Sequence, residues 1–202
     1  MPSAPTATFY FDLASPLAYL AAERVLHVLP RPAEWHPVLA SEIPGADPLE
    51  VWRCAQEQEV FRGECSRRAR ELGLQPLRWP DPFPFDSSLA MRVATYAKSI
   101  GRTVPFAQAA FRQAFAGGHS LENPDFVLIA AAACEMHPAA VLRGAELRSV
   151  AVQLGASSAA AAALGVGDVP AVSVGERVFQ GERAIEEAAA LMGREAIRSE
   201  HA

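Results

Sequence analysis

The residues with the clearest chemical potential are a serine and a proline where a strand-like segment passes into a helix-like one. The stretch "FYFDLASPLAYLA", residues 9–21, places Ser15 and Pro16 at that junction. A serine there is predicted to cap the helix, with the proline as its first residue. The free amides of the first turn would point at whatever lies over Ser15 and would favour an anion. The alternative interpretation is a helix cap only, worth about 1 kcal/mol.

Two further residues have candidate roles. Pro170 follows a glycine-rich turn and begins a strand that leads into a hairpin. That is an expected place for a cis peptide bond, although a trans proline at the start of an edge strand fits the spacing equally well. Asp12 ends the first strand, where burial can raise the pKa of a carboxyl group. A hydrogen-bonded structural aspartate is the favoured interpretation of Asp12.

The elements that must position these residues follow from the periodicity of apolar side chains. Residues 6–12 are predicted as a strand, 16–29 as a helix and 34–40 as a second strand, which favours a parallel pair with a right-handed crossover. Helical periodicity then continues from about residue 42 to residue 165. A hairpin of two strands, 171–174 and 177–179, and a closing helix over 182–192 complete the chain.

Composition excludes several classes of protein. Half of the 202 residues are hydrophobic, and the net charge of −5 gives no reason to expect binding to nucleic acid or to an anionic membrane. No apolar run approaches the length of a membrane helix, and the N-terminus lacks the pattern of a secretory signal, so a cytoplasmic location is expected. Three cysteines in no metal-ligand spacing predict reduced thiols and no metal.

The order of elements resembles the DsbA-like branch of the thioredoxin superfamily. The resemblance rests on "FYFD", on the reactive position three residues later and on "VP" before a hairpin. Enzymes of that branch carry C-P-x-C where this chain has Ser15, Pro16, Leu17 and Ala18. Disulfide exchange needs an attacking thiolate and a resolving thiol, so the chain is not expected to be a disulfide oxidoreductase.

Within the superfamily, the serine-proline opening resembles the 2-hydroxychromene-2-carboxylate isomerase family and its relative, the kappa-class glutathione transferase. Further matches are "WHPVL", "FRGECSRRARELG", "RWPDPFPFDSSLAMRVATYA" and "DVPAVSVGERVFQGERAIE". The resemblance implies an α/β, thioredoxin-like fold with a large α-helical insertion. Residues 5–41 and 166–193 would form the thioredoxin-like domain, and residues 42–165 the insertion.

The same resemblance implies a cofactor and residues that hold it. The cofactor would be glutathione or another low-molecular-weight thiol, with its thiolate at the catalytic Ser15 and its peptide paired with the backbone of Val169 beside Pro170. Glu182 and Arg183 correspond to an acid and an arginine that hold its polar end, although Gln180 stands where glycine is common. The alternative is that Glu182 complements the helix dipole and Arg183 is a solvated surface charge.

A cationic residue for the substrate is less clearly indicated. The family supplies an asparagine and a lysine after the second strand, and residues 41–70 contain neither. Arg53 or Arg62 is the candidate. The usual explanation of the basic cluster formed by Arg62, Arg67, Arg68 and Arg70 is, however, a solvated helix face with Glu64 and Glu71 as partners.

The predicted function is therefore a thiol-dependent isomerase of a small-molecule substrate, with a possible homodimer. The alternatives are a kappa-like glutathione transferase and a non-catalytic thiol- or peptide-binding protein.

Overall fold

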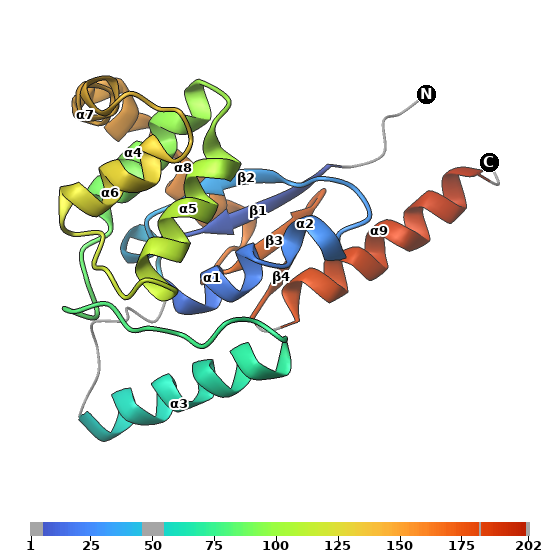
Figure 1. Cartoon of the computed structure of the whole chain (residues 1–202). Helices are drawn as coiled ribbons and strands as arrows, with labels where there is room; N and C mark the ends of the chain where they lie inside the picture. The colour runs from blue at the N-terminus through green and yellow to red at the C-terminus, as the bar shows by residue number, and fades with distance from the viewer. Residues whose placement is uncertain (1–5, 46–54, 182, 201–202) are drawn as a thin grey trace.

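The computed structural model describes residues 6–45, 55–181 and 183–200 of the chain (Figure 1). Its centre is a mixed sheet with the strand order β2-β1-β3-β4. The strands are β1 (Ala7–Phe11), β2 (Glu34–Pro37), β3 (Ala171–Val174) and β4 (Arg177–Gln180). Strand β1 pairs with β2 in parallel and with β3 antiparallel, so that Tyr10 lies opposite His36 on one side and Ala171 on the other. The predicted sharing of one sheet by the first strand and the hairpin is confirmed.

Helices surround this sheet unevenly. Figure 1 shows α4 to α8 gathered at one end, α9 running along the other, and α3 lying apart from the main body. In the described residues they are α1 (Pro16–Ala22), α2 (Val25–Val28), α3 (Ala55–Glu71), α4 (Ser88–Ser99), α5 (Thr103–Phe115), α6 (Pro124–Ala132), α7 (Pro138–Glu146), α8 (Arg148–Leu164) and α9 (Ala184–Glu200), with a 3-10 turn, η1, at Ala40–Glu42.

Two predicted elements are shorter in the structure, each for a visible reason. The first helix was expected to run to residue 29, but it breaks between α1 and α2, where the Arg24 amide bonds the Ala21 carbonyl three residues back. The second strand was expected to reach residue 40. It ends at Pro37: the Val38 amide still donates to the Phe11 carbonyl of β1, but the amides after it bond elsewhere, that of Leu39 to Ser158 Oγ and that of Ala40 to Asp12 Oδ2.

The hydrophobic core has two parts, one on each face of the sheet. Phe9 and Phe11 each contact Trp35 edge to face, and Phe11 also contacts Phe111 of α5 in a tilted arrangement; such pairs contribute roughly 0.5–1.5 kcal/mol each beyond burial. Because side chains alternate along a strand, Tyr10 lies on the opposite face, in a smaller cluster with residues of α8 and with Val169. This smaller cluster thus holds the segment that carries Val169 against the sheet.

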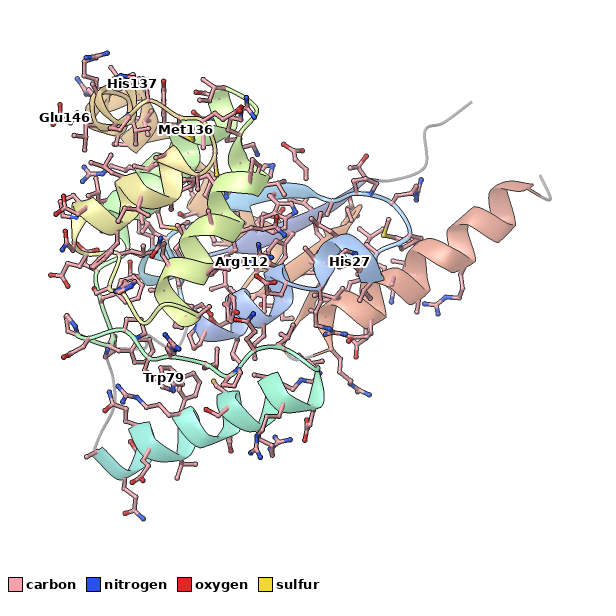
Figure 2. All side chains as sticks on the ribbon, in the orientation of Figure 1. His27, Trp79, Arg112, Met136, His137 and Glu146 are labelled. Carbon is pink, nitrogen blue, oxygen red and sulfur yellow. The ribbon has the colours of Figure 1, made fainter. Side chains whose placement is uncertain are left out.

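Helix α3 has little core of its own. Only Cys65 and Ala69 of its seventeen residues are buried. Trp79, in the segment that follows α3, connects the helix to the body: its ring contacts Phe61 of α3 and Phe115 of α5 (Figure 2). In the described part of the chain no single helix is long and apolar enough to cross a membrane; only α7 and α8 together, bent by 67°, meet that criterion by length and composition.

Candidate functional site

Ser15 is the N-cap of α1, as the sequence predicts. Its hydroxyl oxygen accepts a hydrogen bond from the Ala18 amide at 3.1 Å, and Pro16 is the first helical residue. The Ser15 amide donates to the Asp12 carbonyl at 3.1 Å, which fixes the turn between strand and helix. Ser15 is only 5% exposed. A cap this deeply buried faces other protein groups as well as the helix that it begins.

The group that Ser15 faces is the backbone before Pro170. The Val169-Pro170 peptide bond is cis, and Ser15 Oγ donates to the Val169 carbonyl at 3.4 Å. The predicted cis bond and its closeness to Ser15 are both confirmed. A separation of 3.4 Å is at the long end for a hydroxyl donor, so this hydrogen bond is weak. The hydroxyl can therefore turn to another acceptor at little cost.

The loop before the cis-proline is held by Gln180, the residue that stands where glycine is common in the resembled family. Its Oε1 accepts from the amides of Gly167 and Asp168 at 2.7 and 2.9 Å, and its Nε2 donates to the Gly165 carbonyl at 3.2 Å. The Val169 amide donates to Asp168 Oδ1 at 2.7 Å. The departure at Gln180 thus has a structural role, because it fixes the loop that presents Val169.

Asp12 stabilises the backbone segments beside Ser15. Its Oδ1 accepts from the Ala14 amide and its Oδ2 from the Ala40 amide, both at 2.9 Å. Burial is the largest influence on its pKa and raises it, while hydrogen bonds from the two amides and from Ser87 act in the opposite direction. With both carboxylate oxygens engaged, Asp12 ties the loop before Ser15 to the segment after β2. The structural interpretation of this residue agrees with these contacts.

A narrow groove of about 20 Å³ begins at Pro170, beside the first turns of α1. That volume admits a single water-sized group, so a larger ligand would lie along its open face. The groove is lined by Leu17, Leu20 and Ala21 from α1, by Arg24 at the start of α2, by Arg68 and Leu72 at the end of α3, and by Pro170, Gly181 and Ile185. One wall is apolar and follows α1, and the groove ends at the start of α9.

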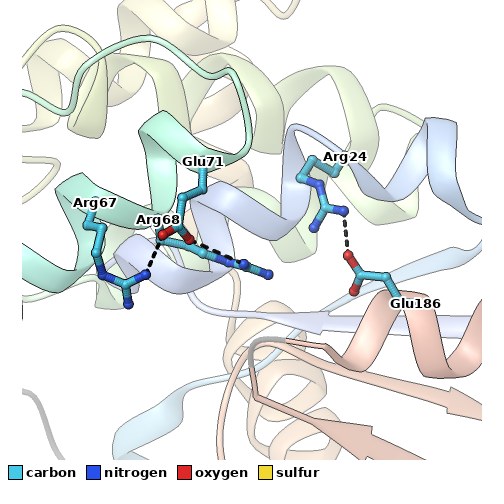
Figure 3. Close-up of polar contacts among 5 residues, drawn as sticks. All are labelled: Arg24, Arg67, Arg68, Glu71 and Glu186. Carbon is cyan, nitrogen blue, oxygen red and sulfur yellow. Dashed lines mark hydrogen bonds and ion pairs between the residues drawn. The ribbon is translucent and has the colours of Figure 1, made fainter.

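Charged side chains gather at the α9 end of this groove. Arg24 forms an ion pair with Glu186, and Figure 3 shows the Arg68 guanidinium extending from α3 toward that pair. Burial, the largest influence, raises the pKa of Glu186, but the hydrogen bond from Arg24 and the charges of Arg24 and Arg68 outweigh it, so the net pKa is lowered. The second oxygen of Glu186, Oε2, is buried and has no hydrogen-bond partner in the described structure.

Sequence reasoning missed this charged end for two different reasons. Arg24 and Glu186 are 162 positions apart, so no local pattern links them. The sequence indicates Arg68 only as one member of a basic cluster on a predicted helix. Its place in the groove depends on how α3 packs against the body, and the spacing of charges does not reveal that.

The other predicted site residues lie elsewhere or outside the described residues. Arg183 is 80% exposed at the start of α9, 3.6 Å from Glu187. The Arg62 guanidinium lies over the rings of Trp79 and Phe83, at 5.1 and 5.6 Å, and is not among the residues that line the groove. Arg53 and Glu182 are outside the described residues. Their predicted roles, and those of Arg62 and Arg183, stay predictions.

Two of the three cysteines are among the described residues. Cys65 and Cys134 are both buried, and burial raises the pKa of the Cys134 thiol. Neither lines the groove. Cys54 lies outside the described residues.

A buried serine cap that faces a cis-proline, in a sheet of this order, defines a thioredoxin-like fold with a helical insertion, and the predicted fold class is confirmed. The sequence model of the DSBA-like thioredoxin domain matches residues 6–193. The chain therefore belongs to the DsbA-like thioredoxin domain family.

Solved structures give the same fold at low sequence identity. A 2-hydroxychromene-2-carboxylate isomerase superposes with a TM-score of 0.83 at 16% identity, covering 97% of this chain and 98% of that one. A probable DsbA oxidoreductase from Streptomyces coelicolor has a TM-score of 0.76 at 18% identity, with 95% and 89% covered. The cytosolic disulfide reductase DsbM from Pseudomonas aeruginosa, in a structure with GSH, has a TM-score of 0.67 at 12% identity, with 96% and 99% covered. No curated protein matches the sequence.

Proposed function

We propose that this protein is a thiol-dependent isomerase similar to 2-hydroxychromene-2-carboxylate isomerase, with glutathione or another low-molecular-weight thiol as its cofactor. The observation that carries the proposal is the buried Ser15 hydroxyl, which lies at the N-terminus of α1 and 3.4 Å from the Val169 carbonyl. No cysteine replaces Ser15 or Ala18, so the nucleophile must come with the ligand. The similarity in fold to the isomerase supports this choice.

The chain's own groups would stabilise a thiolate at this position. The Ser15 hydroxyl would turn from the Val169 carbonyl to donate to the sulfur, and the first-turn amides of α1 would add the positive end of the helix dipole. A thiol at a helix N-terminus has a lowered pKa and is ionised near neutral pH. The bound thiolate supplies a nucleophile that adds to a conjugated double bond and later leaves, with no net redox change. Ser15 is thus the catalytic residue of the proposal.

The open face of the groove offers contacts for the rest of a γ-glutamyl thiol. An extended peptide would pair with Val169, whose amide now donates to the exposed Asp168 carboxylate, a partner that can turn to water. At the far end, Glu186 Oε2 lacks a donor and Arg68 lies nearby, which suits the ammonium and carboxylate of an amino-acid group. The DsbM structure with GSH supports a thiol of this kind. A small-molecule substrate, a homodimer and a cytoplasmic location, as expected from the sequence, belong to the same proposal.

Titration calorimetry with reduced glutathione tests the cofactor, and cysteinylglycine, which lacks the γ-glutamyl group, is the matched control. We expect saturable binding of glutathione and binding of the dipeptide at least tenfold weaker, because it cannot reach Glu186 and Arg68. A glutathione-dependent cis–trans isomerisation assay with a conjugated arylidene pyruvate then tests the reaction. Accumulation of a stable conjugate would indicate the transferase instead. Binding without turnover would indicate a non-catalytic thiol-binding protein.

A further inference from the structure

A second cavity lies on the opposite face of the sheet from α1 and α5. Its volume is about 480 Å³, within the range of small-molecule sites. It is lined by Tyr10, His36, Pro37, Thr95, Lys98, Gln153, Ala156, Ser157, Ala160, Ala161 and Leu164. These residues come from β1, β2, α4 and α8, and none of them lines the groove at Pro170. We call it the Lys98 cavity.

One corner of the Lys98 cavity already holds a carboxylate. Lys98 Nζ and His36 Nε2 both lie 2.9 Å from the same oxygen of Glu34, Oε1. The Lys98 side chain is 23% exposed, whereas that of Glu34 is 56% exposed. The two nitrogen groups are therefore fixed in the wall, and the carboxylate that they bind comes from the rim.

The composition of the chain makes this corner unusual. Arginine supplies every other basic side chain, and Lys98 is the single lysine in the sequence. An ammonium is a compact charge with three donors, and Glu34 Oε1 takes one of them. The remaining donors leave room for a second acceptor or for a replacement of Glu34.

The rest of the cavity is mostly apolar. Ala156 and Ala160 present small side chains from α8, and the edge of the Tyr10 ring packs against His36 with 5.8 Å between their centroids. The Thr95 and Ser157 hydroxyls are engaged within the protein, since Thr95 donates to the Met91 carbonyl and Ser157 to the Pro37 carbonyl, each at 2.9 Å. A ligand would thus meet an apolar wall with one cationic corner.

We propose that the Lys98 cavity binds a small organic anion with a flat apolar body, such as an aromatic monocarboxylate. Its carboxylate replaces that of Glu34 on Lys98 and His36, and its body lies between Tyr10 and the alanines of α8. Glu34 leaves easily because its carboxylate is already more than half exposed to water. Lys98 is mostly buried and keeps an anionic partner throughout, so no unpaired charge is left in the wall.

Titration with 2-naphthoate, followed by its fluorescence, tests this inference, and 2-naphthamide is the neutral control. We expect one saturable site that prefers the carboxylate at least tenfold, the range for a hydrogen bond to a charged group. Lys98→Met removes that preference. Glu34→Gln strengthens naphthoate binding severalfold, because it removes the competing carboxylate. Ala160→Leu, at an exposed helical position, places a larger side chain where the body of the ligand would lie and abolishes binding.

Arg112→Met is the matched charge control, because the Arg112 side chain is 56% exposed, pairs with Glu23 and does not line this cavity. It should leave naphthoate binding unchanged. Thermal melting of each variant establishes that it folds, and the opposite signs expected for Lys98→Met and Glu34→Gln cannot both arise from instability. The inference is overturned by the absence of saturable binding, by binding that survives Ala160→Leu, or by displacement of naphthoate by glutathione, which would place the probe in the other groove.

Discussion

The starts of α1 and α6 are built from the same local pattern. The sequences are "DLASP", residues 12–16, and "SLENP", residues 120–124. In each, the first side chain accepts from the amide two residues on, the leucine is fully buried, and the fourth residue caps a helix that begins with proline. Even the turn is shared: the Ser15 amide donates to the Asp12 carbonyl at 3.1 Å and the Asn123 amide to the Ser120 carbonyl at 3.2 Å.

The two starts differ in their long-range partners. Ser15 is buried and also donates to Val169, and Asp12 also accepts from the Ala40 amide. Asn123 is exposed, and its side chain accepts from the nearby Asp125 amide. The capping motif alone therefore does not make a site. What distinguishes α1 is that residues far along the chain enclose its cap, and α6 serves as an internal control for every test of Ser15.

The largest effect is expected for Ser15→Ala. Loss of a hydrogen bond to the reacting thiolate should lower thiol-dependent kcat by ~10²-fold or more, by analogy with loss of an oxyanion donor. Loss of the cap itself should cost only about 0.5–2 kcal/mol of unfolding free energy. Asn123→Ala should cost a similar amount and leave kcat unchanged. Turnover of Ser15→Ala at the wild-type rate would reduce Ser15 to a helix cap.

Ser15→Cys and Asn123→Cys should differ in how they react with oxidised glutathione. Both place a thiol at a helix N-terminus, where its pKa is lowered. Only the cysteine at position 15 lies beside the groove that we propose to bind the thiol peptide. Its rate of mixed disulfide formation, followed by mass spectrometry, should saturate with oxidised glutathione, whereas the rate at position 123 should rise linearly. Linear behaviour at both positions would argue against the groove.

Asp12→Asn should change how stability depends on pH. The pKa of Asp12 is raised above its ordinary value of 3.8. Its contribution to stability is therefore fully present below that value and is lost as the pH rises through the raised pKa. The advantage of the wild type over Asp12→Asn in unfolding free energy should grow as the pH falls from neutral toward about 4. Urea unfolding at several pH values measures it, and a constant difference would contradict the assignment.

The smallest effects are expected at caps without long-range partners. Asn123→Ala and His137→Ala each remove one exposed side-chain acceptor, at 2.9 and 3.3 Å from an amide. A loss of about 1 kcal/mol should lower Tm by roughly 2–4 °C in a chain of this size. Thiol-dependent activity at a permissive temperature should not change. A fall in activity at either position would show that the comparison between α1 and the other helix starts is too simple.

Local features of the site could be predicted from the sequence, but the long-range contacts that surround Ser15 could not. The cap at Ser15 follows from the residue types at a strand-to-helix junction. The place of Pro170 before a hairpin fits a cis or a trans bond equally, and it is the thiol-binding groove implied by the family resemblance that favours the cis bond seen in the structure. The hydrogen bonds by which Gln180 holds the loop before Pro170 could not be predicted, because the sequence shows only that this residue departs from the family pattern. The break after α1 was missed because its apolar spacing continues to Leu29. The pairing of Arg24 with Glu186 has no local signal, since tertiary packing alone brings the two residues together.

The separation of Ser15 from Val169 by 154 positions also determines when the site can form during synthesis. Until β3 leaves the ribosome, β1 has a partner along β2 only, and its other edge, in a strand containing Phe9 and Phe11, is unpaired. An open edge on an apolar strand is a template for pairing with other chains. The helices between, whose contacts are more local, can fold earlier. The nascent chain therefore carries its capped helix through most of translation, and the groove beside that helix is completed among the last parts of the molecule.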